Sequence, residues 1–118
     1  MAITESPVSD RSLFLIDIEP FSEGLEDYSF LAGVTDEQFE RASLELAQWL
    51  SRMRSVKSDT QGVDLIVAIK EYLGLDTTYG TTILFNAIHE VLGMTGYIDS
   101  SLLMSKLKER RDVWLAQQ

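Results

Sequence analysis

Few residues of this sequence have the type and spacing that catalysis or metal binding requires. His89 is the only histidine, and Gly93 stands where a zinc hydrolase helix would carry its second histidine. A metal site needs several convergent ligands, so we do not expect His89 to bind a metal. The chain has no cysteine, which excludes disulfides, thiolate zinc sites and cysteine nucleophiles.

Asp17 and Glu19 are the one pair of carboxylates whose spacing suggests a shared site. On a strand they would point to the same side, and paired carboxylates can hold Mg²⁺ or act as acid and base. No third acid has a persuasive spacing and no lysine is near, so an exposed acidic face is the preferred interpretation. The glycines also lack the Lys-Ser or Lys-Thr ending of a phosphate-binding loop. We therefore assign no catalytic residue, cofactor or metal.

The net charge of −9 is confined to the first third of the chain. Residues 1 to 40 hold ten acids and a single base, Arg11, whereas the rest of the chain holds nine acids and nine bases. An acidic surface repels nucleic acid and anionic membranes and favours basic protein partners. The alternative is that the charge only keeps a small protein in solution.

Residues 63 to 73 are apolar around most of a helix axis, apart from a narrow polar stripe through Asp64, Lys70 and Glu71. This pattern predicts a buried central helix on which the other amphipathic segments pack. The short β-branched run 65–69 is also compatible with a buried strand. Gly74 directly follows the last apolar residue and is typical of a helix end, which favours the helix.

The most regular pattern begins at Thr35. Thr35 and Gln38 have the spacing of a capping box, and acids at positions 36 and 37 suit the positive end of a helix dipole. Apolar residues then recur at spacings of three and four, at Phe39, Ala42, Leu46, Trp49, Leu50, Met53 and Val56. The pattern predicts an amphipathic helix with a polar outer face.

Two further helices are expected in the second half of the chain. One runs from Thr81 to Leu92, and the other begins at a cap formed by Asp99 or Ser100. The last helix has inward residues at Leu102, Leu103, Leu107 and Trp114, and a basic outer face at Lys106, Lys108, Arg110 and Arg111. Acids interrupt its basic residues, so we expect no direct binding of nucleic acid.

Residues 12 to 19 are the best strand candidate, because Phe14, Ile16 and Ile18 alternate along one face and Pro20 follows. The alternative is an extended arm that packs on the helices through Phe14 and Ile16. Residues 21 to 34 mix acids with aromatic residues. They favour a short helix or loop that covers the core, with a docking segment for a basic groove as the alternative.

These patterns predict a mainly α protein of about four main helices, with an acidic N-terminal arm that has room for one short strand. A chain of 118 residues has the size of one domain. Residues 1–34 form the arm, packed on or extending from a helical domain at 35–118. The first residues lack the basic start and apolar run of a secretory signal, and no apolar run reaches the roughly 18 residues of a membrane span. We expect a cytoplasmic location and no membrane contact.

The preferred functional hypothesis is a noncatalytic protein-protein interaction module that binds a basic partner, as an adaptor, assembly chaperone or inhibitor. The expected binding residues are Asp17, Glu19, Glu23, Glu26, Asp27, Tyr28, Asp36, Glu37 and Glu40. The alternative is a nucleic-acid mimic of the kind that phages and mobile elements encode, with carboxylates in rows spaced like phosphates. A small enzyme with an unfamiliar site around Asp17, Glu19 and His89 is the least favoured hypothesis.

A homodimer is compatible with each of these hypotheses. Trp49, Met53, Trp114 and the strand candidate offer enough apolar surface for a symmetric interface. The same residues would equally complete a monomeric core.

Overall fold

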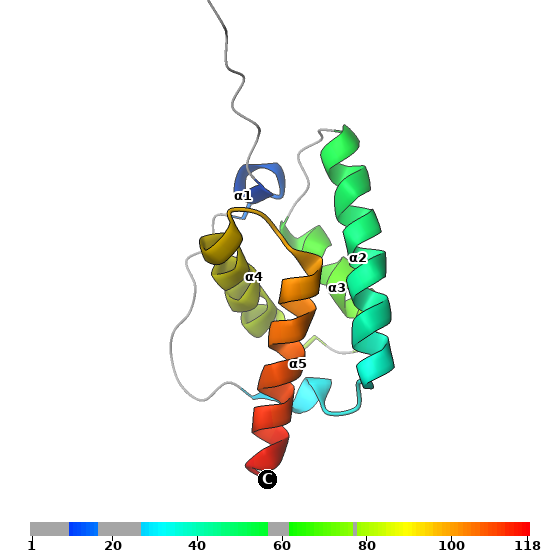
Figure 1. The fold of residues 1–118 in the computed structure, drawn as a ribbon, viewed down its shortest axis with the longest axis vertical. Helices are drawn as coiled ribbons and strands as arrows, with labels where there is room; N and C mark the ends of the chain where they lie inside the picture. Colours follow the sequence, from blue (N-terminus) through cyan, green and yellow to red (C-terminus); the bar gives the residue numbers. More distant parts are fainter. Residues whose placement is uncertain (1–9, 17–26, 57–61, 77) are drawn as a thin grey trace, which may run out of the picture.

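A computed structural model describes residues 10–16, 27–56, 62–76 and 78–118 of the chain (Figure 1). Its elements are a short helix α1 (Asp10–Leu13), a 3-10 turn η1 (Tyr28–Leu31) and four long helices. The long helices are α2 (Asp36–Val56), α3 (Gly62–Leu73), α4 (Thr81–Thr95) and α5 (Ser100–Ala116). The residues described contain no strand, so the predicted mainly α class and its four main helices are confirmed.

Local capping fixes where the helices begin and end. The Gln38 backbone N–H donates to Thr35 Oγ1 at 3.1 Å, and the Thr35 N–H donates to Gln38 Oε1 at 3.0 Å, which confirms the capping box of α2. Asp99 caps α5 by accepting a bond from the Leu102 N–H at 3.1 Å. Gly74 follows α3 with φ at 73°, a left-handed conformation that favours glycine.

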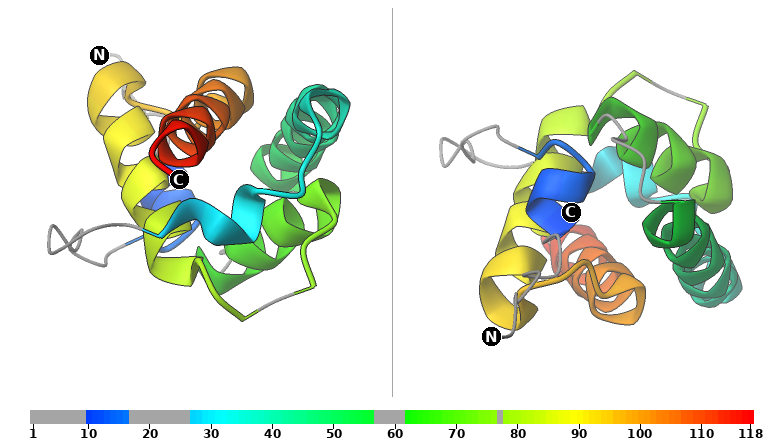
Figure 2. Two further views of the ribbon diagram at one scale, coloured as in Figure 1. Left: turned by 90° about the horizontal axis from the view of Figure 1, so that it is seen from below. Right: turned by 90° about the horizontal axis from the view of Figure 1, so that it is seen from above.

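The four long helices form a closed ring around the core. Helix α2 packs on α3 and α5, and α4 packs on the same two helices, so each long helix has two neighbours. The end-on views of Figure 2 show the order α4, α5, α2, α3 around the molecule. The largest fully buried aliphatic residues come from all four helices, and they include Leu46, Leu50, Leu65, Ile69, Leu84, Ile88 and Leu103.

The prediction that residues 63–73 form the central helix is therefore wrong in one respect. The segment is helical, but it is one side of the ring, and the interior is filled by side chains from all four helices. Val63 and Val67 are 56% and 57% exposed because they lie on the side of α3 that no other helix covers. Val56, predicted to face inward, is also exposed at the last residue of α2.

The strand candidate at residues 12–19 is wrong over the part that the structure describes. Ser12 and Leu13 belong to α1, and the Ile16 N–H donates to the Arg11 carbonyl at 2.8 Å in a turn that follows it. Phe14 and Ile16 are nevertheless fully buried, as the alternative interpretation expected. Their alternation comes from a helical turn followed by a residue with positive φ, Leu15 at 48°, and not from a β-strand. Residues 17–19 lie outside the described part of the chain.

The described part of the segment at 21–34 covers the core, as the preferred interpretation predicted. Tyr28, Leu31 and Val34 are buried against it, and η1 packs on α5. Among the residues described, no helix combines the length and the apolar character that crossing a bilayer requires.

Candidate functional site

The predicted binding residues divide into three groups in the structure. Asp17, Glu19, Glu23 and Glu26 lie outside the described residues. Asp27 and Tyr28 belong to η1 and its cap, and Asp36, Glu37 and Glu40 lie on the first two turns of α2.

Asp27 and Tyr28 have structural roles in η1. Asp27 is the N-cap and accepts a bond from the Ser29 backbone N–H at 2.9 Å, which lowers the pKa of the Asp27 carboxyl. Tyr28 is 6% exposed, and its ring stacks on Phe30 with 6.5 Å between centroids. The predicted role of Tyr28 in partner binding stays a prediction, and η1 turns this aromatic ring towards the core together with Leu31.

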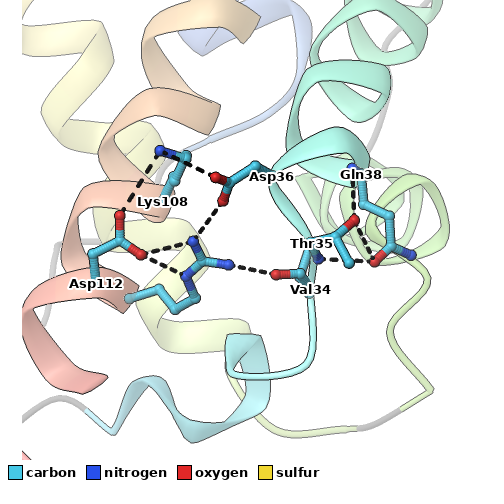
Figure 3. A network of polar contacts seen from close by, with 7 residues as sticks. Val34, Thr35, Asp36, Gln38, Lys108 and Asp112 are labelled. Atoms are coloured by element: carbon cyan, nitrogen blue, oxygen red, sulfur yellow. Dashed lines mark hydrogen bonds and ion pairs between the residues drawn. The ribbon is translucent and has the colours of Figure 1, made fainter. Parts of the chain in front are cut away.

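Asp36 is held by a buried arginine of α5 (Figure 3). Arg111 Nη2 donates to Asp36 Oδ1 at 2.9 Å and to Asp112 Oδ1 at 2.7 Å, while Nη1 donates to the Val34 carbonyl. The guanidinium also lies 5.0 Å from the centroid of the Phe39 ring. We call these five residues the Arg111 cluster. It joins the start of α2 to the second half of α5.

The prediction that Arg111 belongs to the basic outer face of the last helix is wrong, since this residue is only 6% exposed. Leu103 and Leu107, also buried, precede it at intervals of four residues, so Arg111 continues the inward face of α5. That spacing was the sequence signal for its burial. Arginine can occupy such a position because its long apolar stem packs like a hydrophobic side chain while the guanidinium finds acceptors.

A second cluster joins the end of α2 to α1 and to the segment just before α5. Asp10 is 5% exposed and accepts two bonds from Arg54, one of them from Nε at 2.9 Å. It also accepts the Ile98 backbone N–H at 2.6 Å, and Arg54 Nη2 donates to the Ile98 carbonyl at 3.1 Å. We call these three residues the Asp10 cluster. The two clusters show that α2 and α5 run antiparallel and are fixed to each other at both ends.

A groove of about 560 Å³ lies between the two clusters, along α2 and α5. Its floor is apolar, because Phe39 and Met104 line it and are each 2% exposed. Its walls carry three small side chains, Ser43, Ser101 and Ser105. This groove is the candidate functional site.

Polar and apolar groups occupy distinct positions along the groove. Asp36 and Glu40 lie at the end nearer the Arg111 cluster, and Lys108 lines the same end. Lys108 Nζ is 4.0 Å from Asp36 and 3.8 Å from Asp112. One turn beyond Glu40, Leu44 is 69% exposed. The groove thus presents an acidic end beside an exposed leucine.

The hydrogen bond from Arg111 lowers the pKa of Asp36, opposed by slight burial and assisted by the charge of Lys108. Asp36 consequently keeps its negative charge well into the acidic range, although part of that charge is compensated within the molecule. Glu37 and Glu40 are exposed, and Glu40 is the other carboxylate of the groove. Of the two groove carboxylates, only Asp36 takes part in the ion pairs described, which leaves Glu40 as the one available to a partner's cation.

A larger cavity, of about 990 Å³, lies beside the start of α2, between η1 and the α3–α4 turn. Its lining includes two carboxylates, Asp27 and Asp76, next to the start of α4 at Thr81. Carboxylates attract cations, whereas a helix start attracts anions. Because Asp27 is already used as a cap and these preferences conflict, we assign the cavity no ligand.

Of the three residues considered for catalysis, the structure describes only one. His89 lies half-buried on α4, and Asp17 and Glu19 fall outside the described residues. Within the described ranges, no three histidine, aspartate or glutamate side chains are grouped so as to hold a metal ion.

No protein-family model matches the chain, and comparisons with curated proteins and with solved structures give no significant match.

Proposed function

We propose that this chain is a noncatalytic interaction module, such as an adaptor, assembly chaperone or inhibitor, that binds a basic protein partner through the start of α2. The observation that carries the proposal is the exposure of Glu37 and Glu40 on a helix start held in place by a capping box and by Arg111. Charges on a rigid helix start keep their positions before a partner arrives, so little ordering is needed on binding. The proposed location is the cytoplasm, and the absence of cysteine is compatible with a reducing compartment.

The nucleic-acid mimic receives less support from the described residues. Asp27 caps η1 and Asp36 bonds to Arg111, so both carboxylates face groups of the protein itself. A phosphate-like row needs carboxylates that are all presented to the partner.

Affinity capture from the native host's lysate, at low and at high salt, tests the proposal. We expect a basic protein to be retained at low salt and lost at high salt, because salt screens contacts between exposed charges. In the double variant Glu37→Gln and Glu40→Gln, binding of that protein should fall by roughly tenfold, the effect of about 0.7 kcal/mol for each exposed charge.

The matched control removes the same charge from another helix. Asp64→Asn with Glu71→Gln alters two exposed acids of α3 and should leave capture of the partner unchanged. Equal loss in both double variants would show that net charge alone governs binding, and retention of the partner by the α2 variant would contradict the proposed surface. A captured nucleic-acid-binding protein that duplex DNA displaces would favour the mimic.

A further inference from the structure

Leu44 is an exception on the outer face of α2. The exposed positions around it are polar or small, namely Glu40, Arg41, Ala47 and Gln48, yet Leu44 is 69% exposed. Covering an exposed leucine side chain removes apolar surface from water and so stabilises a complex. Leu44 lines a groove whose apolar floor is already buried, so a partner that enters the groove would mainly cover Leu44.

The walls of the groove allow a helix to come close. Ser101 and Ser105 lie one turn apart on α5, and Ser43 lies opposite on α2. Small side chains let the backbone of a third helix approach, as they do where helices cross at short distance. The volume of about 560 Å³ suits a few side chains from one helix and not a folded domain.

The charges along the groove indicate the chemistry of the occupant. Glu40 and Leu44 are four residues apart, which places them about 6 Å apart along the axis of α2. Lys108 is the only cation among the residues that line the groove, and its ammonium group is already close to both Asp36 and Asp112. A complementary helix therefore has an apolar anchor and, one turn away, a lysine or arginine that faces Glu40.

We infer that the groove between α2 and α5 is the docking site for a short amphipathic helix of the partner, whose leucine-type anchor contacts Leu44 and whose basic residue pairs with Glu40. This inference rests on the proposed function and specifies its partner. The Arg111 cluster holds one end of the groove, and the Asp10 cluster holds the far end of α2, so the groove exists before the helix binds. A second copy of the chain fits less well, because each copy has a net charge of −9 and two copies repel each other.

Synthetic peptides of about 15 residues, long enough to become helical on binding, test the inference. The first carries leucines at helical spacing with lysines between them. The second is a scrambled peptide of equal composition without the stripe, and the third has glutamate in place of lysine. Binding to the full chain is measured by fluorescence anisotropy and mapped by amide chemical shifts in ¹⁵N NMR spectra.

We expect the striped lysine peptide to shift the amide signals of Ser43, Leu44, Ser101 and Ser105. The scrambled and glutamate peptides should bind at least about tenfold more weakly, since each lacks one of the two complementary features. Leu44→Lys and the groove-filling Ser105→Trp should each weaken binding of the striped peptide by a similar factor. Val67→Lys, the matched control at an exposed apolar residue of α3, should leave its affinity unchanged.

Four results would overturn the inference. Equal affinity for the striped and scrambled peptides would show that only charge is recognised, and shifts outside the groove would place the site elsewhere. A dimer in sedimentation that Leu44→Lys dissociates would show that a second copy covers the groove. Leu44→Lys could leave both the affinity for the striped peptide and the capture of the partner unchanged, while the Glu37 and Glu40 double variant loses the partner. The proposed docking site would then be wrong, and the proposed function would stand. If no basic protein is captured at all, the proposed function fails.

Discussion

The Asp10 cluster and the Arg111 cluster differ in the sign of their buried charge, which is a carboxylate in the first and a guanidinium in the second. In the Asp10 cluster the carboxylate is buried, with 6% of its side chain exposed, while the Arg54 side chain is 35% exposed. In the Arg111 cluster the guanidinium is buried, with 8% exposed, and its carboxylate partners Asp36 and Asp112 are 70% and 50% exposed. Asp10 has Arg54 as its cationic partner, whereas Arg111 has two anionic partners and a carbonyl.

This difference decides which substitutions unfold the protein. Removing an exposed partner leaves a buried charge without compensation, which costs far more than removing a charge whose partners can be hydrated. A buried charge with several partners tolerates the loss of one. The cluster with the single cationic partner should therefore be the more sensitive of the two.

Arg54→Met should have the largest effect. It leaves the Asp10 carboxylate buried with only the Ile98 N–H among the contacts described, and we expect the free energy of unfolding to fall by about 3 kcal/mol. Chemical denaturation measures the change. The double variant Asp10→Asn with Arg54→Met should be more stable than Arg54→Met alone, because it removes the uncompensated charge. Equal stability of the two variants would show that lost packing, and not the buried charge, causes the effect.

Arg111→Met should have a smaller effect, about 2 kcal/mol in the free energy of unfolding. It removes the bond to the Val34 carbonyl and the contact with the Phe39 ring, but Asp36 and Asp112 can both be hydrated. The matched control is Arg110→Met, one residue earlier, which removes the partly exposed ion pair with Glu90 and the hydrogen bond with Tyr28 and should cost about 1 kcal/mol. An equal loss in both variants would contradict the special position of Arg111.

The helices and their caps could be predicted from the sequence because these features depend on neighbouring residues. Thr35 and Gln38 define the start of α2, and Gly74 marks the end of α3. The spacing of apolar residues predicted four main helices for the same reason. Burial within those helices was harder to predict. In the ring, each long helix packs on two other helices, so one side of it faces solvent. An almost fully apolar segment such as α3 therefore still exposes Val63 and Val67.

The candidate site depends on contacts between residues far apart in the chain, and the sequence predicted only its acidic part. Glu40 and Asp36 were expected to bind a partner, and both line the groove. The sequence did not predict the groove itself, because Leu44, Ser101 and Ser105 line one groove only when α2 and α5 pack side by side. The exposed leucine in an otherwise polar helix face was the available signal.

The smallest effect is expected from Asp36→Asn, and its pH dependence sharpens the comparison. The bond from Arg111 holds the pKa of Asp36 below its usual value of 3.8, so the unfolded chain takes up a proton at this residue more readily than the folded protein. The stabilisation from Asp36 is therefore fully present above that usual value and is lost as the pH falls towards the folded-state pKa. The Asp36→Asn variant has no carboxylate at this position, so its stability lacks this pH-dependent contribution.

Thermal denaturation of the protein and of Asp36→Asn, from about pH 6 down to about pH 2.5, measures this difference. We expect the unfolding temperature of the unsubstituted chain to lie slightly higher near neutral pH and to converge with that of the variant in acid. Glu109→Gln, an exposed residue of the same charge on α5, controls for the loss of one negative charge. A difference that stays constant or widens in acid would mean that Arg111 relies on Asp112 and the Val34 carbonyl alone. The tolerance of the Arg111 cluster would then come from two partners and not from three.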